Sequence, residues 1–79
     1  MTIVIVPSIL AMDWRVIVGG NVLKLRKRRG LSQEDLAGDA EIDVTYLRGI
    51  ERGRRNPSLL VMVRLADQLG VHPSKLLQD

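Results

Sequence analysis

Residues 32–51, SQEDLAGDAEIDVTYLRGIE, decide the fold of this chain. Their apolar residues fall at the positions that two short helices crossing at a steep angle would bury. These residues are Leu36, Ala37, Ala40, Ile42, Leu47 and Ile50. Ala37 is small, as a residue at a close helix crossing must be. The second helix then presents its other face, with Val44, Thr45 and Arg48, to solvent.

Both helices carry start signals. Ser32 and Asp43 are preferred N-cap residues, and Ser32 with Asp35 resembles a capping box that has Asp in place of Glu or Gln. The turn between the two helices normally holds a residue that tolerates a positive φ, usually glycine. Here Glu41 occupies that position and the glycine, Gly38, comes earlier. We therefore expect a strained or shifted turn.

Further helices are predicted on both sides. The first runs from Asp13 or Trp14 to Arg29, although Gly19 and Gly20 leave a start near Asn21 open. Its buried stripe is Val18, Val22 and Leu25. The crossing helices span about 32–38 and 44–52, and Gly53 is free to adopt a left-handed conformation after the second.

A fourth helix opens at Pro57 and Ser58 and is stopped by Gly70, and a short fifth helix covers 74–77. The core positions that we expect on the fourth helix are Leu59, Met62, Val63, Ala66 and Leu69. No strand pattern of useful length occurs except IVIV at 3–6. The fold class is therefore all-α, with five helices.

Composition limits the function classes. A chain of 79 residues suffices for one domain with a modest core, and with no cysteine and a single histidine it offers neither a disulfide framework nor a zinc site. We expect no catalytic residues, metal, cofactor or small-molecule ligand. The net charge is only +3, but the basic residues are concentrated in two clusters. Beside a pair of crossing helices, such clusters favour contact with nucleic acid. They are Lys24, Arg26, Lys27, Arg28 and Arg29, and Arg48, Arg52, Arg54 and Arg55.

From about Val18 to Leu77 the sequence resembles the Cro/C1-type (XRE) family of bacterial and phage helix-turn-helix repressors. The matching pieces are VLKLRKRRGLSQEDLA at 22–37, DVTYLRGIERGRRNPSL at 43–59 and RLADQLGVHPSKLL at 64–77, in the family's order and spacing. Residues 43–58 are also similar to the small homodimeric controller proteins of restriction–modification systems. The resemblance implies a lambda-repressor-like domain over 13–79 and a cytoplasmic regulator of transcription that binds double-stranded DNA.

The second helix of the motif is the predicted recognition helix. We expect Thr45 and Arg48 to read bases, because Arg can donate two hydrogen bonds to a guanine and Thr can bond a base or touch a thymine methyl. Val44 offers apolar contact only. Tyr46 is left with two alternatives, a partly buried ring that braces the helix or an edge-on contact with DNA.

Other residues are expected to hold the DNA backbone. Ser32 and Gln33 begin a helix whose N-terminus in this family points at a phosphate. Arg52, Arg55 and Asn56 follow the recognition helix as it leaves the groove. The resemblance implies that Arg26 and Glu51 instead form a structural ion pair.

One short recognition helix makes few base contacts, so we expect a two-fold homodimer on an inverted-repeat operator. Apolar residues in excess of one small core suggest the interface, unless Leu60 and Val61 merely cover the N-terminal segment. These residues are Leu60, Val61, Val71, Leu76 and Leu77.

Residues 1–12 form an apolar extension that is too short to span a bilayer and lacks the positive start of a signal peptide. A tail, an arm packed on the domain or its partner, and a translation start at Met12 all remain open. The competing function class is a protein-interaction module, an antitoxin or antiactivator with the same fold. Repression or autoregulation is our first expectation, because repression requires only occupancy of the operator.

Overall fold

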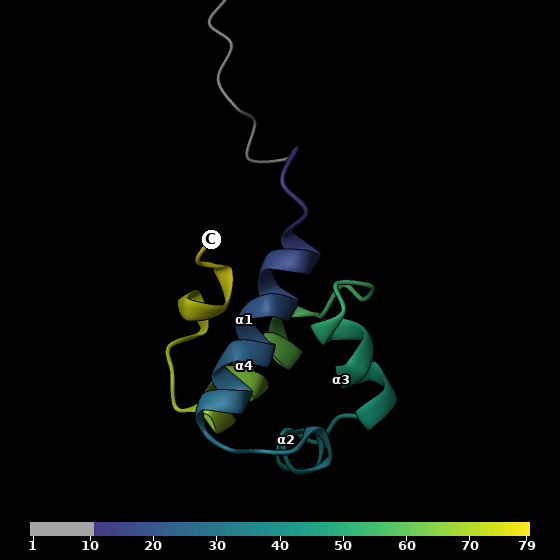
Figure 1. The fold of residues 1–79 in the computed structure, drawn as a ribbon, viewed down its shortest axis with the longest axis vertical. Coiled ribbons are helices and arrows are strands. Elements are labelled where there is room, and N and C mark those ends of the chain that lie inside the picture. The colour runs from purple at the N-terminus through teal and green to yellow at the C-terminus, as the bar shows by residue number, and fades with distance from the viewer. Residues whose placement is uncertain (1–10) are drawn as a thin grey trace, which may run out of the picture.

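The computed structural model describes residues 11–79 (Figure 1). The elements are α1 (Trp14–Arg28), α2 (Gln33–Asp39), α3 (Val44–Glu51), α4 (Leu59–Leu69) and a final 3₁₀-helix, η2 (Pro73–Leu77). The described residues contain no strand, so the predicted all-α class is confirmed. The last element is a 3₁₀-helix, which leaves four α-helices in place of the five expected helices. The IVIV pattern and most of the apolar extension lie outside the described residues.

The helix starts follow from local capping chemistry. The Ser32 hydroxyl accepts a hydrogen bond from the Asp35 backbone N–H at 2.9 Å, and the Asp35 carboxylate accepts one from the Ser32 N–H at 3.4 Å. The predicted capping box is therefore present. Asp43 caps α3 at 2.7 Å and Ser58 caps α4 at 3.1 Å. Each element thus begins where the sequence supplies an acceptor for its unpaired N–H groups.

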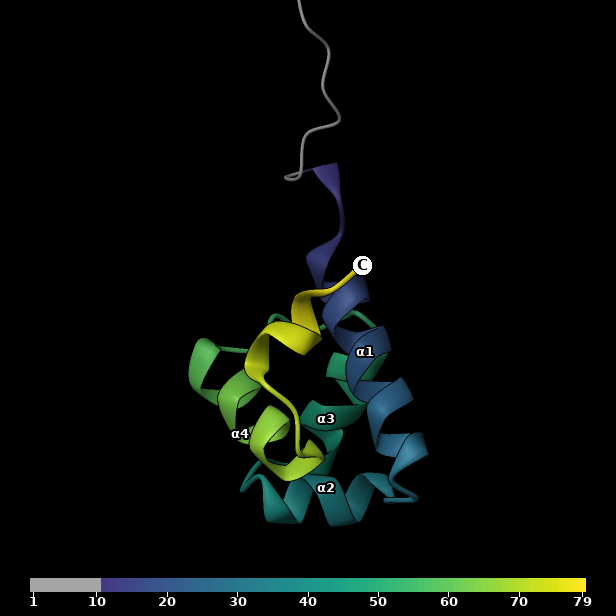
Figure 2. The same ribbon diagram turned by 90° about the vertical axis from the view of Figure 1, so that its left-hand side faces the viewer.

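One buried core joins all five elements. Figure 2 shows η2 beside α1 and α4, with α2 crossing at the opposite end of the molecule, and α3 packs against α1 and α2. The buried hydrophobic residues are Val18, Val22, Leu36, Ala37, Ala40, Leu47, Ile50, Leu65, Ala66, Leu69 and Leu76. Leu25 and Ile42, also expected inside, are partly buried against this core. The crossing pair at 32–51 is therefore packed as its apolar pattern predicts.

The prediction for α4 is wrong at two positions. Leu59 and Val63 were expected in the core, yet they are 76% and 40% exposed, whereas Leu65 is fully buried. Apolar residues occupy the first five positions of α4, so more than one face satisfies a helical hydrophobic period. Contact with η2 and the other helices selects the face with Leu65, Ala66 and Leu69.

The structure also bears on the residues expected at the dimer interface. Leu76 is fully buried in the protomer's own core, so its side chain has no surface to offer a partner. Val61 and Val71 are partly buried against the same core. Leu60 and Leu77 are exposed by 59% and 47%. Of the expected residues, Leu60 and Leu77 are therefore available to an interface on this face, and Leu76 is not.

The turn between α2 and α3 is strained, as expected. Glu41 has φ 59°, and within residues 11–79 it is the one non-glycine residue with a positive φ. A Cβ in this left-handed region crowds the following carbonyl, at a cost of roughly 1–2 kcal/mol. The turn geometry is therefore retained although its residue type disfavours it.

Candidate nucleic-acid interface

A buried ion pair fixes α3 against α1. Arg26 donates from Nε to Glu51 Oε2 at 2.7 Å and from Nη2 to Oε1 at 3.0 Å, and its Nη1 donates to the Leu31 carbonyl at 2.9 Å. The two side chains are only 11% and 3% exposed. The hydrogen bonds to Glu51 raise the pKa of the Arg26 guanidinium. Arg26 and Glu51 thus form the expected pair, and Arg26 belongs to the interior of the domain.

A chain of polar contacts continues from this pair to the surface. Gln33, the first residue of α2, donates from Nε2 to Glu51 Oε1 at 2.9 Å. The other end of the same amide, Oε1, accepts from Arg48 Nε at 3.2 Å. Arg48 Nη2 then donates to Glu34 Oε1 at 3.0 Å. The Gln33 side chain therefore faces α3, and these contacts leave one Nε2 proton and the backbone N–H of Gln33 for the expected phosphate contact.

The outer face of α3 carries the predicted base-reading residues. Thr45 is exposed, and the Arg48 side chain is 42% exposed. Val44 and Tyr46 are partly buried and pack against the core. The position of the Tyr46 ring agrees with the bracing alternative, and its contact with DNA stays a prediction. This face combines a hydroxyl and a guanidinium, the two groups that can donate to base edges.

The loop after α3 folds back over this helix. Gly53 has φ 73° and directs the chain away from α3, and the Arg54 N–H donates to the Gly49 carbonyl at 2.9 Å. A Cβ at Gly49 would lie 2.6 Å from Arg55 Cγ. The Arg55 guanidinium carbon lies 5.9 Å from the centroid of the Tyr46 ring, within cation–π range.

Gly49 is therefore the residue that makes room for Arg55 on α3. Sequence reasoning missed this role, and the available signal was a glycine inside a helix, where it costs about 1 kcal/mol relative to alanine. Arg52, Arg54 and Asn56 are exposed beside Arg55, so the loop adds cationic and polar groups next to the outer face of α3.

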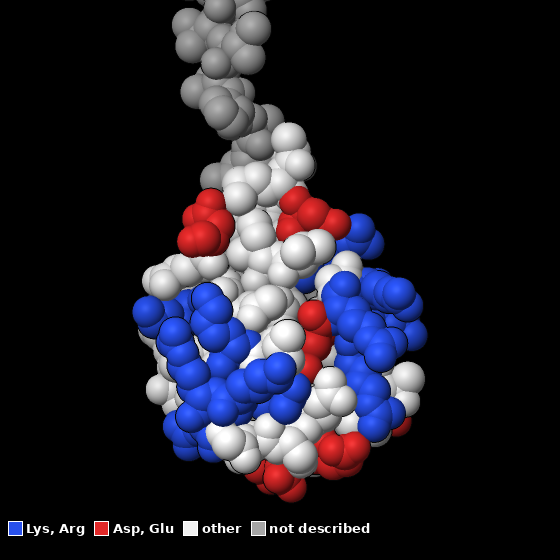
Figure 3. All heavy atoms as spheres, viewed as in Figure 1, with Lys and Arg blue, Asp and Glu red and all other residues white. Residues whose placement is uncertain are grey.

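The positive charge on the surface is divided between two areas (Figure 3). Lys and Arg gather in two areas, one over the C-terminal half of α1 and one over α3 and its following loop, with acidic groups below them at α2. The α1 area includes exposed Lys24, Lys27, Arg28 and Arg29, whereas Arg26 is buried. Arg29 also donates to the Leu69 carbonyl at 3.3 Å, which ties it to α4. The two areas flank the start of the motif with positive charge.

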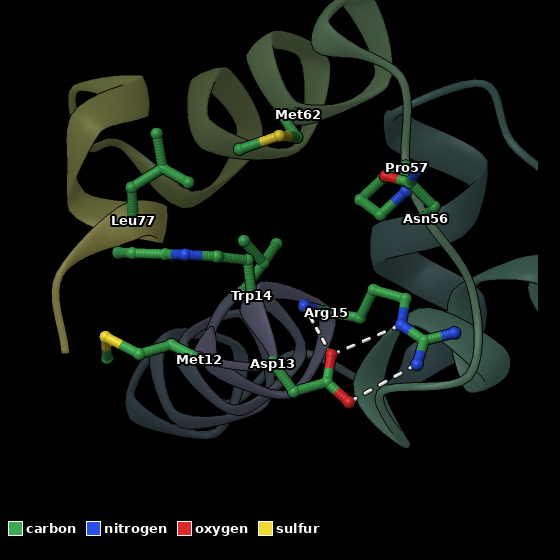
Figure 4. Close-up of a pocket in the computed structure, with 9 residues that line it drawn as sticks. Met12, Asp13, Trp14, Arg15, Asn56, Pro57, Met62 and Leu77 are labelled. Atoms are coloured by element: carbon green, nitrogen blue, oxygen red, sulfur yellow. Dashed lines mark hydrogen bonds and ion pairs between the residues drawn. The ribbon is translucent and has the colours of Figure 1, made fainter. Parts of the chain in front are cut away.

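A separate cavity lies beside the start of α1. An open pocket of about 320 Å³ is lined mainly by apolar side chains. In Figure 4 the Trp14 ring extends toward Leu77, whereas Asn56 and Pro57 lie on the opposite side. At its rim Arg15 Nε contacts Asp13 Oδ1 at 3.2 Å, and this hydrogen bond lowers the pKa of the Asp13 carboxyl, which caps α1.

The described residues, 11–79, offer neither a cluster of metal ligands nor a membrane-spanning helix. They contain no group of three or more His, Cys, Asp or Glu side chains that could hold a metal ion. None of their helices is long and apolar enough to cross a membrane.

The fold and this surface define a helix-turn-helix protein, and comparison with known proteins agrees. The helix-turn-helix family model HTH_3 matches residues 22–76, so the chain belongs to this XRE-type family. The control protein C.MunI of a Mycoplasma species is 38% identical over 68 residues, which are 85% of this chain and 92% of that protein. The family and its relatives are transcription regulators and not enzymes.

Solved structures give the same result. The restriction–modification controller protein C.AhdI from Aeromonas hydrophila superposes with a TM-score of 0.76 and 42% sequence identity, covering 78% of this chain and 94% of that one. The biofilm master regulator SinR, solved in complex with DNA, superposes with a TM-score of 0.74 and 32% identity, covering 77% of this chain and 98% of that one. The chain is therefore similar both to controller proteins and to a regulator seen on DNA.

Proposed function

We propose that this protein is a repressor or autoregulator of transcription that binds an inverted-repeat operator as a homodimer. The observation that carries the proposal is the outer face of α3, where Thr45 and Arg48 stand exposed beside an arginine-rich loop. The fold is shared with SinR, which has been solved on DNA. In a helix-turn-helix protein the second helix of the motif enters the major groove, so this face would meet the base edges.

Base reading is assigned to α3. Arg48 donates to O6 and N7 of a guanine, and Thr45 bonds a base or touches a thymine methyl. Val44, at the start of α3, adds apolar contact with a second methyl. The contribution of Tyr46 is its ring, which supports Arg55 from below.

Backbone contacts surround the groove. The start of α2, at Ser32 and Gln33, is assigned to a phosphate of the DNA backbone. Arg52, Arg55 and Asn56 extend from the end of α3 and its loop, where exposed cations release counterions from DNA. These contacts supply affinity and orientation, whereas sequence preference comes from α3.

The homodimer is proposed to form through α4 and η2. Leu59, Leu60 and Val63 are exposed and recur at three- and four-residue spacing, which places them on one side of α4. Leu77 is exposed on η2, and η2 packs against α4. Exposed apolar residues gathered in this way favour association over solvent contact. The proposed interface keeps Leu60 and Leu77, leaves out the buried Leu76 and the partly buried Val61 and Val71, and adds Leu59 and Val63.

Repression follows from simple occupancy. A bound dimer excludes polymerase from an overlapping promoter, whereas activation requires an additional surface that touches polymerase. Such a regulator acts in the cytoplasm of its bacterial host, where the operator lies.

The test compares Arg48→Ala with Arg55→Ala on the preferred operator and on operators with single base-pair changes. Loss of Arg48 should reduce preferred-site affinity by about 1–3 kcal/mol per contact and relax preference at one base pair in each half-site. Loss of Arg55 should weaken all sequences almost equally and make the salt dependence shallower by about one unit per protomer. The reverse pattern would mean that α3 lies in the groove in a different register.

A further inference from the structure

The Glu34 carboxylate meets Arg48 on one particular edge of the guanidinium. Arg48 Nε donates to Gln33 Oε1 at 3.2 Å and Arg48 Nη2 donates to Glu34 Oε1 at 3.0 Å. Nε and Nη2 form the side edge of the planar guanidinium. Two residues of α2, Gln33 and Glu34, therefore occupy this edge. Rotation about the last bonds of the side chain would break one of these contacts.

The orientation of Gln33 is itself determined from the interior. Its Nε2 donates to Glu51 Oε1 at 2.9 Å, and an ionised carboxylate can only accept hydrogen bonds. The amide therefore has to direct its nitrogen at Glu51 and its oxygen at Arg48. Glu51 is held in turn by two hydrogen bonds from Arg26, with its side chain only 3% exposed. The buried ion pair thus fixes the acceptor that Arg48 meets at the surface.

This arrangement decides which donors Arg48 has left. A guanidinium carries five N–H donors in one plane, and the contacts to Gln33 and Glu34 use two of them. Both protons of Nη1 and one proton of Nη2 remain, and one proton from each of these two nitrogens forms the end of the guanidinium. This end can still donate two parallel hydrogen bonds to O6 and N7 of a guanine.

We infer that Glu34 is a positioning residue for sequence discrimination, which holds Arg48 so that the end of its guanidinium, and not its side edge, meets a guanine. The inference rests on the proposed function, because it assigns the orientation of a base-reading arginine. Glu34 has two opposing effects on DNA binding. Its negative charge repels phosphates and lowers affinity for every sequence, while its hold on Arg48 favours the correct base pair.

The Arg48–Glu34 ion pair contributes little to the free energy of folding. A variant that breaks it should therefore still fold, and its DNA binding can be measured. Arg48 and Glu34 have side chains that are 42% and 66% exposed, and an ion pair this exposed is weak as a stabilising contact. Glu34→Gln should therefore fold normally. Asp39→Asn is the matched control, because it removes the same charge from an exposed position on the same helix.

The binding experiment measures the ratio of affinities for the preferred operator and for an operator in which the G·C pair read by Arg48 is replaced by A·T. Both variants should bind random DNA slightly more tightly than the wild type. Glu34→Gln should lower the affinity ratio by about three- to tenfold, whereas Asp39→Asn should leave it unchanged. In an Arg48→Ala background, Glu34→Gln should have no further effect on the ratio.

A second measurement needs no DNA. The Arg48 Nε–H resonance in a ¹H–¹⁵N spectrum should be slow to exchange in the wild type and in Asp39→Asn, and should broaden in Glu34→Gln. An unchanged resonance in Glu34→Gln, or an affinity ratio that falls equally in both single variants, would overturn the inference. So would a fall in the ratio that persists in the Arg48→Ala background.

The proposed function fails in a different way. If the wild type shows no preferred operator, or if Arg48→Ala retains the full affinity ratio, then Arg48 does not read a base and the base-reading assignment is wrong. The discriminating role of Glu34 is overturned with it, whereas the spectrum still reports whether α2 holds the guanidinium.

Discussion

Gly19 of α1 lies against the backbone carbonyl of Ile50 in α3 so closely that no Cβ fits between the two helices. The neighbouring Gly20 faces open space, with nothing within 4 Å of a Cβ built there. α1 runs unbroken through both glycines. Gly19 thus allows α3, which carries the proposed base-reading residues, to pack closely against α1, whereas a side chain at Gly20 would meet no neighbour.

Adjacent glycines should consequently respond in opposite directions to alanine. Gly19→Ala forces α1 away from the backbone of α3, and overpacking of this kind costs about 1–3 kcal/mol, which exceeds the gain in helix propensity. Gly20→Ala should gain about 0.5–1 kcal/mol. Urea unfolding of the two variants measures both effects. Equal changes in the free energy of unfolding would show that α1 and α3 do not approach each other as closely as described.

Glycine at position 41 should stabilise the protein. Glu41→Gly removes the left-handed strain at φ 59°, and part of this gain is lost to the greater entropy of glycine in the unfolded chain. We expect a net rise of about 0.5–1 kcal/mol, or several degrees in Tm. Glu41→Ala is the control, because it removes the same charge and keeps the Cβ. A gain in Glu41→Ala as large as in Glu41→Gly would assign the effect to charge and not to strain.

The buried and exposed ion pairs should differ strongly in stability. Glu51→Gln leaves Arg26 as an uncompensated charge in the interior, which costs about 3–5 kcal/mol and is a large part of the stability of a small domain. Glu34→Gln breaks an exposed pair and should change stability by no more than about 0.5 kcal/mol. Thermal unfolding followed by circular dichroism compares them. A Glu51→Gln variant as stable as Glu34→Gln would contradict the structural role of the buried pair.

Leu60→Glu should dissociate the proposed dimer. The substitution places a charge on the exposed apolar side of α4, where association would have to desolvate it. Val16→Glu is a matched control, since Val16 is 57% exposed on α1, outside the proposed interface. Sedimentation velocity should give a monomer for Leu60→Glu at concentrations where the control is a dimer. Dimers of equal stability in both variants would place the interface on another surface.

Local signals in the sequence located the five helical elements, although the last of them is a 3₁₀-helix. N-cap residues predicted the starts of the crossing helices, and the capping box at Ser32 follows from residue type. The positive φ at Glu41 was expected from its position in the turn, although its residue type disfavours that conformation. These features depend on neighbours within four residues, so the sequence carries them directly.

Contacts between elements were less predictable. The apolar residues of α4 allow several buried faces, and packing against η2, α1 and α2 distinguishes Leu65 from Val63. The engagement of Arg48 by Gln33 and Glu34 depends on distances between two helices, which no periodicity encodes. The space above Gly49 for Arg55 has the same origin. Sequence analysis therefore identified the candidate base-reading residues but not the side chains that hold them.

The central claim, sequence-specific DNA binding through the outer face of α3, is tested most directly by selecting duplexes from a random pool with the purified protein at low salt. The account predicts an enriched inverted repeat with half-site centres roughly 10 bp apart, or a multiple of that spacing, and a G·C pair at one fixed position in each half. The same selection with Arg48→Ala should lose the preference at that position only. Recovery of no common sequence above non-specific binding would contradict the account and favour a protein-interaction role for the same fold.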